Sequence, residues 1–228
     1  MQKKKEVSVY LHFYTIPWFF LFFSLFLGTA ANAQEQLPSP SLDVTNQSLT
    51  LFTGQGVDHD LPGLPKAIVR GDIRWDKSYY TGLAYARTRK TLGDSFESLQ
   101  GNPLGALRHG YEIIFLQHHG LQDNAELGAT YFLRTPNLEL GPVRVNFGAG
   151  GGLSHAFGKP TYEDGPADNP QRRYRTQFSG FMELEWSVAA LPQFSLALRV
   201  QHRSGIYGLI APRRVGSNFL AAALRYKF

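Results

Sequence analysis

The 228-residue sequence contains no cysteine, so no disulfide bond stabilises the protein, and burial and hydrogen bonding must hold it together. It also lacks acidic residues toward its end, because no Asp or Glu follows Glu185. A Gly-x-Ser-x-Gly motif is absent as well, and this argues against a soluble hydrolase of the α/β class. These absences leave a fold without crosslinks and restrict any chemistry near the C-terminus to neutral and basic side chains.

The longest apolar run lies at the start of the chain. Lysines at positions 3–5 precede it, it extends to Leu27, and the small residues Ala31 and Ala33 follow. These three parts are typical of a secretory signal peptide with cleavage after Ala33. An uncleaved membrane anchor is the alternative, because 7–28 is nearly long enough to span a bilayer, although a histidine and a proline interrupt it.

Three parts of the chain are therefore predicted: a signal peptide (1–33), a polar periplasmic lead-in (34–46) and one domain (47–228). Removing the signal peptide takes away three lysines and Glu6 and lowers the net charge from +5 to +3. This mild basicity does not indicate a nucleic-acid partner. The mean hydropathy of −0.23 is typical of a soluble protein, but transmembrane barrels give similar values because only alternate residues face lipid.

The domain is divided by turn residues into segments of about ten residues, the length that a tilted strand needs to cross a bilayer. In 178–188, apolar residues and glycine occupy the even positions while polar residues occupy most odd ones, as in a strand with one apolar face. Segments 124–134 and 143–154 alternate similarly. The candidate strands are 48–56, 67–76, 79–89, 109–118, 124–134, 141–154, 177–188, 193–203 and 218–228.

Nine candidates conflict with the even number of strands in bacterial single-chain barrels. We therefore expect 67–76 and 79–89 to form one long strand or a local hairpin. The prediction is an all-β protein: an eight-stranded antiparallel transmembrane β-barrel that follows a cleaved signal peptide. A diffusion porin is disfavoured, because side chains fill the interior of a barrel with about eight strands.

A soluble β-sandwich would show the same alternation, and the end of the chain distinguishes the two. From Leu220 to Phe228 the even positions form an apolar row that closes on an aromatic C-terminal residue. Such a row resembles the signal read by the outer-membrane assembly machinery, which makes this machinery an expected partner through Phe228. Together with the export signal, it predicts the outer membrane of a Gram-negative bacterium.

With the C-terminus in the periplasm, loops 155–176 and 204–217 are expected outside the cell. Both loops are rich in arginine. Guanidinium groups at this level can contact the phosphates of lipopolysaccharide. The candidate phosphate contacts are Arg172, Arg173, Arg175, Arg213 and Arg214.

The strand 193–203 carries polar residues on its lipid-facing side. Its even positions run from Phe194 to Val200 and continue to His202 and Ser204. A histidine facing lipid costs free energy unless it lies at the interface or has a partner, and a serine two residues along shares its face. The pair has the composition of a nucleophile and its base. A strand that simply emerges into the headgroup layer is the alternative explanation.

The segment Val200-Gln201-His202-Arg203-Ser204-Gly205 and the aromatic end of the final strand resemble the lipid A 3-O-deacylase family and its acyloxyacyl-hydrolase-like relatives. The resemblance is confined to about the last thirty residues. It implies an eight-stranded outer-membrane barrel that hydrolyses an ester-linked acyl chain of lipid A with a His-x-Ser pair and a downstream acid. Ser204 would be the nucleophile and His202 its base, with no metal or organic cofactor.

The acid of that family would fall near Gly216, where this sequence has none. Asn218 shares the parity of the lipid-facing row and lies on the neighbouring strand, so its amide could orient the imidazole as in Cys-His-Asn sites. A residue that merely starts a strand is the alternative. The sequence leaves two functions open: an esterase acting on lipid A, or a non-catalytic barrel, structural or lipopolysaccharide-binding, that has lost the acid.

Overall fold

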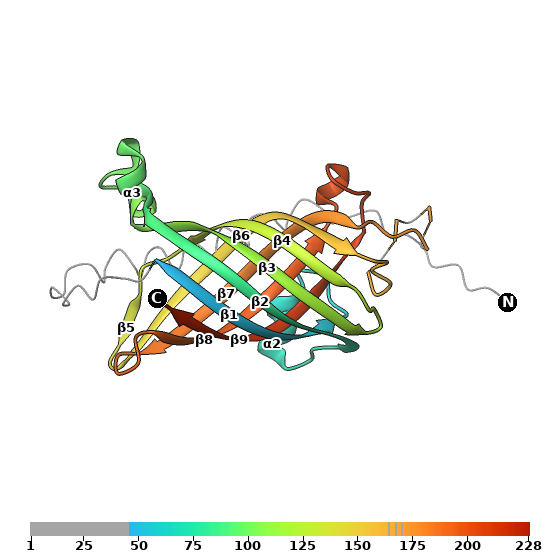
Figure 1. Ribbon diagram of the computed structural model, residues 1–228, viewed down its shortest axis with the longest axis horizontal. Helices are drawn as coiled ribbons and strands as arrows, with labels where there is room; N and C mark the ends of the chain where they lie inside the picture. Colours follow the sequence, from blue (N-terminus) through green and yellow to red (C-terminus); the bar gives the residue numbers. More distant parts are fainter. Residues whose placement is uncertain (1–45, 164, 167, 170) are drawn as a thin grey trace.

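The computed structural model describes residues 46–163, 165–166, 168–169 and 171–228. In this part of the chain, one antiparallel sheet closes on itself (Figure 1), because β1 pairs with β9 and β4 pairs with β6. The predicted eight-stranded barrel is confirmed. The predicted signal peptide and nearly all of the lead-in lie outside the described residues.

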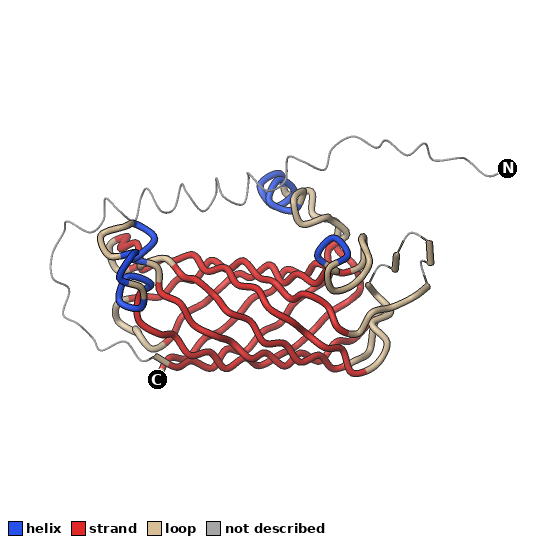
Figure 2. The backbone as a smooth tube through the Cα atoms, turned by 90° about the horizontal axis from the view of Figure 1, so that it is seen from above, coloured by secondary structure: helices blue, strands red, loops and turns tan. Residues whose placement is uncertain are grey.

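Among the described residues, eight strands form the barrel, and a ninth, β5, pairs only with β6 beyond the barrel wall. The connections carry short helices, which Figure 2 shows at both ends of the cylinder of strands. In chain order the elements are β1 (Gln47–Val57), α2 (Leu64–Arg70), β2 (Trp75–Thr91), α3 (Leu92–Ser95), η2 (Glu97–Leu99), η3 (Pro103–Ala106), β3 (Arg108–Gly120), β4 (Ala125–Arg134), β5 (Leu138–Leu140), β6 (Val143–Phe157), β7 (Thr176–Val188), β8 (Phe194–Ser204), η4 (Ile206–Gly208) and β9 (Gly216–Lys227).

One predicted strand was wrong. Residues 67–70 belong to helix α2, and β2 begins only at Trp75, so 67–76 and 79–89 form neither one long strand nor a hairpin. Pro65 stands in the first turn of the helix, and Gly71 ends the helix with φ +70°. These are the ordinary start and stop residues of a helix. The apolar run Ala67-Ile68-Val69 imitates a strand because it is too short to show a helical period.

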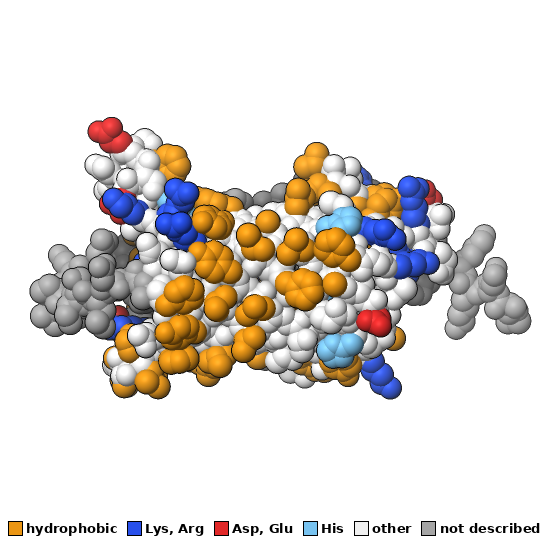
Figure 3. Space-filling model, in the orientation of Figure 1, with side chains coloured by type: hydrophobic (Ala, Val, Ile, Leu, Met, Phe, Trp, Pro, Cys, Tyr) orange, Lys and Arg blue, Asp and Glu red, His pale blue; other side chains and the backbone are white. Residues whose placement is uncertain are grey.

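The wall of the barrel is apolar outside, while its inner side carries the buried charged side chains together with a buried apolar cluster. Figure 3 shows a broad hydrophobic area on the outer wall. This is the reverse of a soluble barrel and is typical of strands that face lipid. No helix in the described residues is long and apolar enough to cross a membrane. The exposed apolar residues on the strands include Leu51, Leu83, Ile113, Phe115, Leu127, Leu153, Leu196, Leu198 and Leu224.

The lumen is filled by a network of ion pairs and by a cluster of buried apolar side chains that includes Phe52, Ile114 and Phe219. The ion-pair network contains five carboxylates and five cations, so their formal charges balance, and nearly all of these side chains are buried. Arg199 bonds both to Glu112 at 2.6 Å and to Glu183 at 2.7 Å, which joins opposite parts of the wall. The members are Glu112, Glu126, Glu163, Glu183, Glu185, Arg134, Arg199, Arg203, Arg225 and Lys227.

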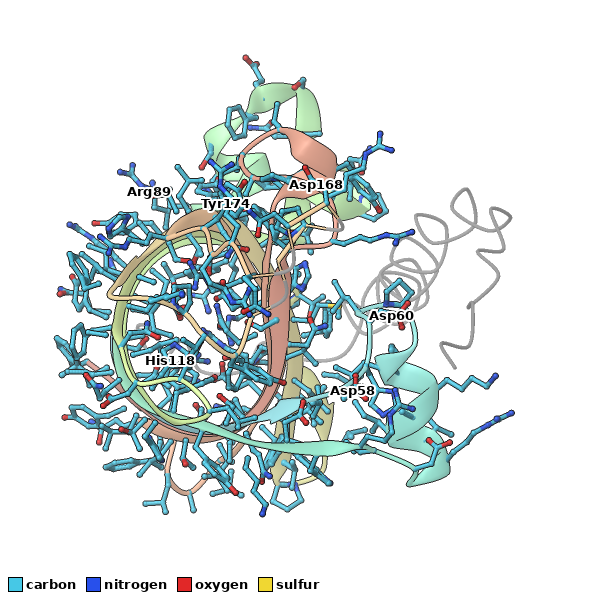
Figure 4. The ribbon with its side chains drawn as sticks, turned by 90° about the vertical axis from the view of Figure 1, so that its right-hand side faces the viewer. Asp58, Asp60, Arg89, His118, Asp168 and Tyr174 are labelled. Carbon is cyan, nitrogen blue, oxygen red and sulfur yellow. The ribbon has the colours of Figure 1, made fainter. Side chains whose placement is uncertain are left out.

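The two ends of the barrel differ. We call the end that holds Gln47 and Phe228 the terminal end, and these two residues exchange backbone hydrogen bonds there. The opposite loop end carries the connections 58–74, 121–124, 158–175 and 205–215. In Figure 4, which looks at the loop end, His118 lies inside the ring of strands while Asp58 and Asp60 lie outside it. The loop 58–74 therefore leans over the outer wall rather than over the lumen.

Candidate active site on the outer wall

His202 and Ser204 lie on the outer face of β8 near the loop end. Arg199, Gln201 and Arg203 point into the lumen and are at most 3 % exposed, while His202 and Ser204 are half-buried. In the register of the sheet, His202 stands between Gly180 on β7 and Asn218 on β9. The orientation expected from the parity of the strand is therefore the one the barrel adopts.

The side chains of His202 and Asn218 are joined by a hydrogen bond. Nδ1 of the imidazole lies 2.7 Å from Oδ1 of the amide. The amide nitrogen donates to the backbone carbonyl of His59 at 2.7 Å, and Asn218 is only 8 % exposed beneath this loop. Because a carbonyl can only accept, the amide nitrogen must face His59 and the amide oxygen must face the imidazole.

This chain of bonds fixes the protonation of the ring. Oδ1 of the amide accepts, so Nδ1 of His202 carries the hydrogen and, in the neutral ring, Nε2 keeps a lone pair. Among the described residues, Nε2 has no hydrogen-bond partner. On the β7 side the Phe178 ring packs edge-on against the imidazole at 6.5 Å between centroids. The arrangement presents an unprotonated nitrogen at an apolar wall.

Ser204 ends the strand and leads into a strained loop. It lies about 6.6 Å along the strand from His202 by the usual rise, and no hydrogen bond within the described residues joins the two side chains. After Gly205, Ile206 and Tyr207 have φ of +43° and +52°. Positive φ is rare for a β-branched residue, and strain of this kind clusters at functional sites.

Gly216, where the acid of the resembling family would fall, cannot carry any side chain. Its φ is +132°, and a Cβ built there would lie 1.9 Å from the carbonyl oxygen of Arg203. The backbone of β9 passes so close to β8 at this point that only glycine fits. The lack of an acid at this position therefore follows from the close packing of the two strands. The side chain of β9 that bonds to the imidazole is the amide of Asn218, two residues later.

Arg203, between the two candidate residues, connects the site to loop 158–175 through the lumen. Its guanidinium pairs with Glu163 of that loop, bonds to Ser154 at 3.0 Å and donates to the carbonyl of Arg175 at 2.8 Å. It also lies 3.5 Å from Glu126. Two buried carboxylates thus share one guanidinium. Burial raises the pKa of Glu163 to about 7 although Arg203 opposes the shift.

This pKa predicts a pH dependence of stability. The folded barrel holds the Glu163 proton more tightly than the unfolded chain, whose carboxyl has the ordinary value of 4.5. The contribution of Glu163 to the free energy of unfolding should therefore be highest below about pH 4.5 and should fall as the pH rises to about 7. Thermal unfolding of the wild type and Glu163→Gln between pH 4 and 8 checks this, since glutamine removes the decline. The exposed Glu97→Gln is the control, and parallel curves for all three proteins would contradict the prediction.

Three of the predicted phosphate contacts come together at one hollow. A hollow of about 350 Å³ on loop 158–175 is lined by Lys159, Pro160, Gln171, Arg172, Arg173 and Arg175. Arg172 also lies over the Tyr174 ring at 5.0 Å. The other two, Arg213 and Arg214, are exposed on loop 205–215 and do not line this hollow. Lys159 was missed because a single lysine after a strand carries no signal in the sequence.

Comparison with known proteins identifies similar folds. No family model matches this sequence, and no curated protein matches it. Among solved structures, the chain is similar to the outer membrane enzyme PagL, with a TM-score of 0.50 and 10 % identity over 79 % of this chain and 99 % of that one. Neisserial surface protein A (TM-score 0.46, 12 % identity, 81 % and 99 % covered) and the N-terminal barrel of Pseudomonas aeruginosa OprF (0.44, 9 %, 82 % and 100 %) are more distant. At these identities the likeness concerns the fold.

Proposed function

We propose that the protein is an esterase of the Gram-negative outer membrane that hydrolyses an ester-linked acyl chain of lipid A. Ser204 is the nucleophile, His202 is the general base and Asn218 orients the imidazole. The loop end faces outward and the terminal end faces the periplasm, with Phe228 in the row read by the assembly machinery. PagL, described as an outer membrane enzyme, shares the barrel.

The proposal depends on one observation, the bonded chain from His202 through Asn218 to the carbonyl of His59. It holds the imidazole in the tautomer that a general base needs, on the wall that faces lipid. A histidine placed there only by the end of a strand needs no such support. The hydroxyl of Ser204 shares this face, and hydrogen bonds of catalytic groups often form fully only with substrate bound.

The reaction proceeds by acyl transfer to the serine. Nε2 of His202 takes the proton as Oγ of Ser204 attacks the ester carbonyl, and the alcohol leaves with that proton. Water then hydrolyses the acyl-enzyme, releasing the fatty acid and restoring the hydroxyl. The substrate reaches the wall by diffusing within the outer leaflet, so no passage through the lumen is needed.

The loop after Ser204 has the composition for contact with a lipid headgroup. Leu209 is 80 % exposed and Tyr207 is 66 % exposed, while Arg213 and Arg214 follow a few residues later. Apolar side chains can enter the acyl layer while guanidinium groups pair with phosphate. The basic hollow on loop 158–175 offers a second phosphate contact at the same end of the barrel.

The test is Ser204→Ala in an outer-membrane host, with lipid A examined by mass spectrometry. We expect the deacylated species to appear with the wild type and to disappear with this variant. Ser195→Ala is the matched control, because Ser195 lies on the same strand, faces the lumen and has no hydrogen-bond partner in the described residues. Loss of the product in both variants, or in neither, would overturn the assignment.

A lipopolysaccharide-binding barrel without catalysis is the second candidate. It is favoured by the absence of an acid at Gly216 and by the amide of Asn218 nearby, because an amide orients an imidazole without stabilising its charged form. In that case the wild type produces no deacylated lipid A although it is folded in the membrane. Binding should then depend on the basic hollow, so that Arg172→Ala with Arg175→Ala weakens retention of lipopolysaccharide while Ser204→Ala does not.

A further inference from the structure

The connection between β2 and β3 is unusually elaborate for the terminal end of a transmembrane barrel, where turns are short. Residues 92–107 form α3, η2 and η3, whereas 189–193 link β7 to β8 directly. Figure 1 shows α3 projecting from this end of the barrel. Most connections in compact domains are much shorter than this one.

A capping box holds the start of this connection in place. The backbone N–H of Asp94 donates to Oγ1 of Thr91 at 3.2 Å, and the Asp94 carboxylate accepts from the N–H of Thr91 at 3.2 Å. The N–H of Leu92 donates to the carbonyl of Leu107 at 2.8 Å, which closes the connection at its base. Ser95, one residue after Asp94, is thereby fixed relative to β2 and β3.

Ser95 lies at the end of a second row of hydrogen-bonded side chains. Its Oγ is 2.8 Å from Nε2 of His109, and Nδ1 of the same ring is 2.6 Å from the hydroxyl of Tyr131. His109 is 6 % exposed on the outer wall of β3, while Ser95 is exposed. When Nδ1 donates to the tyrosine oxygen, Nε2 accepts from the serine. An accessible serine, a buried base and an orienting group form the pattern of an activated nucleophile.

Two cations lie on β2 opposite His109, the hydrogen-bond partner of this serine. The register of β2 and β3 shifts at a β-bulge between Thr88 and Thr91. The bulge places Arg89 and Lys90 opposite His109. Both are exposed, and Figure 4 shows Arg89 outside the ring of strands. Bulges often occur beside active sites because they re-aim side chains. The cations supply contacts for a phosphate close to the nucleophile.

An apolar surface lies on the same connection. Phe96 is 51 % exposed with its ring 6.5 Å from that of His109, and Leu104 is 41 % exposed. Figure 3 shows hydrophobic side chains on this projecting segment and Lys and Arg side chains next to it. An ester that contacts both the cations of β2 and the apolar side chains of this connection carries a phosphate and an acyl chain. With the terminal end in the periplasm, the lipid at this level belongs to the inner leaflet.

We propose that Ser95, His109 and Tyr131 form a second, separate esterase site that cleaves an acyl ester of a glycerophospholipid in the inner leaflet. Ser95 and His109 are catalytic residues and Tyr131 is a positioning residue. The site rests on the membrane orientation given under the proposed function but not on the chemistry at His202. Its place at the opposite end of the barrel allows each site to work without the other.

The chemistry balances with water as the only co-reactant. Nε2 of His109 takes the hydroxyl proton as Oγ of Ser95 forms a bond to the ester carbonyl carbon. The bond between that carbon and the glycerol oxygen then breaks, and the oxygen leaves with the proton from His109. Water attacks the acyl-serine in the same way, which releases a fatty acid and returns the proton to Oγ.

The experiment uses the full-length barrel folded in vesicles of phosphatidylethanolamine and phosphatidylglycerol, with Ser204→Ala as the background so that the first site is silent. A fluorophosphonate probe and fatty-acid release are measured together. We expect labelling and release to be lost in Ser95→Ala, and release to fall about a hundredfold or more in His109→Gln. Ser98→Ala, an exposed serine on the same connection, should match the background protein.

Two results would overturn the second site: labelling that persists in Ser95→Ala, or no fatty-acid release from vesicles by the background protein. Heat-modifiable migration in gels shows whether each variant is folded, so loss of structure is not mistaken for loss of the nucleophile. The two sites are tested separately, because deacylation of lipid A is assayed with Ser204 intact and release from vesicles is assayed with Ser204→Ala. A negative result at the first site therefore leaves the result at the second site unchanged. For Tyr131→Phe, a lower kcat with the same KM supports positioning, and unchanged kinetics would remove tyrosine from the site.

Discussion

Replacing Glu183 with glutamine should lower the free energy of unfolding by about 3–5 kcal/mol, the cost of breaking a buried ion pair from one side. Glu183 is 0 % exposed in its side chain and accepts from three guanidinium groups: Arg134 at 2.8 Å, Arg199 at 2.7 Å and Arg225 at 2.8 Å. Glutamine keeps the shape but removes the charge. Three cations would then depend on the remaining lumen carboxylates, and the balance of five against five would be lost.

The measurement is urea-induced unfolding of the barrel in lipid vesicles. Glu139→Gln is the matched control, because Glu139 forms an ion pair with Arg144 at 3.1 Å but its side chain is 54 % exposed. Exposed pairs contribute about 0–1 kcal/mol. Equal small losses in both variants would mean that water screens the lumen and that the network contributes little to stability.

The alternation along the strands predicted the faces of the wall, and the apolar row at the end of the chain together with the export signal distinguished a membrane barrel from a soluble sandwich. Strands β6 and β7 end within a few residues of the predicted 141–154 and 177–188. A period of two decides which side chains face lipid, because one face must be apolar and the other must not. The same reasoning placed His202 and Asn218 on one face of neighbouring strands, where the register pairs them.

The partners that hold these side chains could not be predicted, because they depend on closure of the barrel and on loops. The amide of Asn218 bonds to the carbonyl of His59, 159 positions earlier in the chain. In the sequence, Asp58-His59-Asp60 resembles a solvated turn, and a backbone carbonyl leaves no mark in the residue pattern. Arg199 and Glu112, 87 positions apart, meet only because the sheet closes.

Ser95 and His109 were missed for a related reason. A serine in a polar segment and a histidine at the start of a strand are ordinary residues, and their spacing matches no known motif. Only the folding of 92–107 brings Ser95 within 2.8 Å of the ring. Sequence patterns reveal sites within one strand or across paired strands, whereas sites built by a folded connection need the coordinates.

Replacing Asn218 with leucine should lower the rate of lipid A deacylation about 10²- to 10⁴-fold. Leucine has a similar volume but cannot accept from Nδ1 of His202, which donates no other hydrogen bond among the described residues. The imidazole can then rotate or place its hydrogen on Nε2, and a protonated Nε2 takes no proton from Ser204. Because the amide lies beneath the His59 loop, kcat should fall while KM stays unchanged.

Asn218→Asp provides the informative contrast. A carboxylate accepts from Nδ1 and stabilises the imidazolium, so the rate should stay within about tenfold of the wild type or exceed it. Its second oxygen, however, would face the carbonyl of His59 in place of the amide donor. Two acceptors facing each other should cost about 1–3 kcal/mol of stability. If Asn218 positions the imidazole, the deacylation rate and the free energy of unfolding should not change together. Asn218→Leu should lower the rate, whereas Asn218→Asp should keep the rate and lower the free energy of unfolding. If both variants lose activity in proportion to their stability, Asn218 serves only the packing of β9 against the loop.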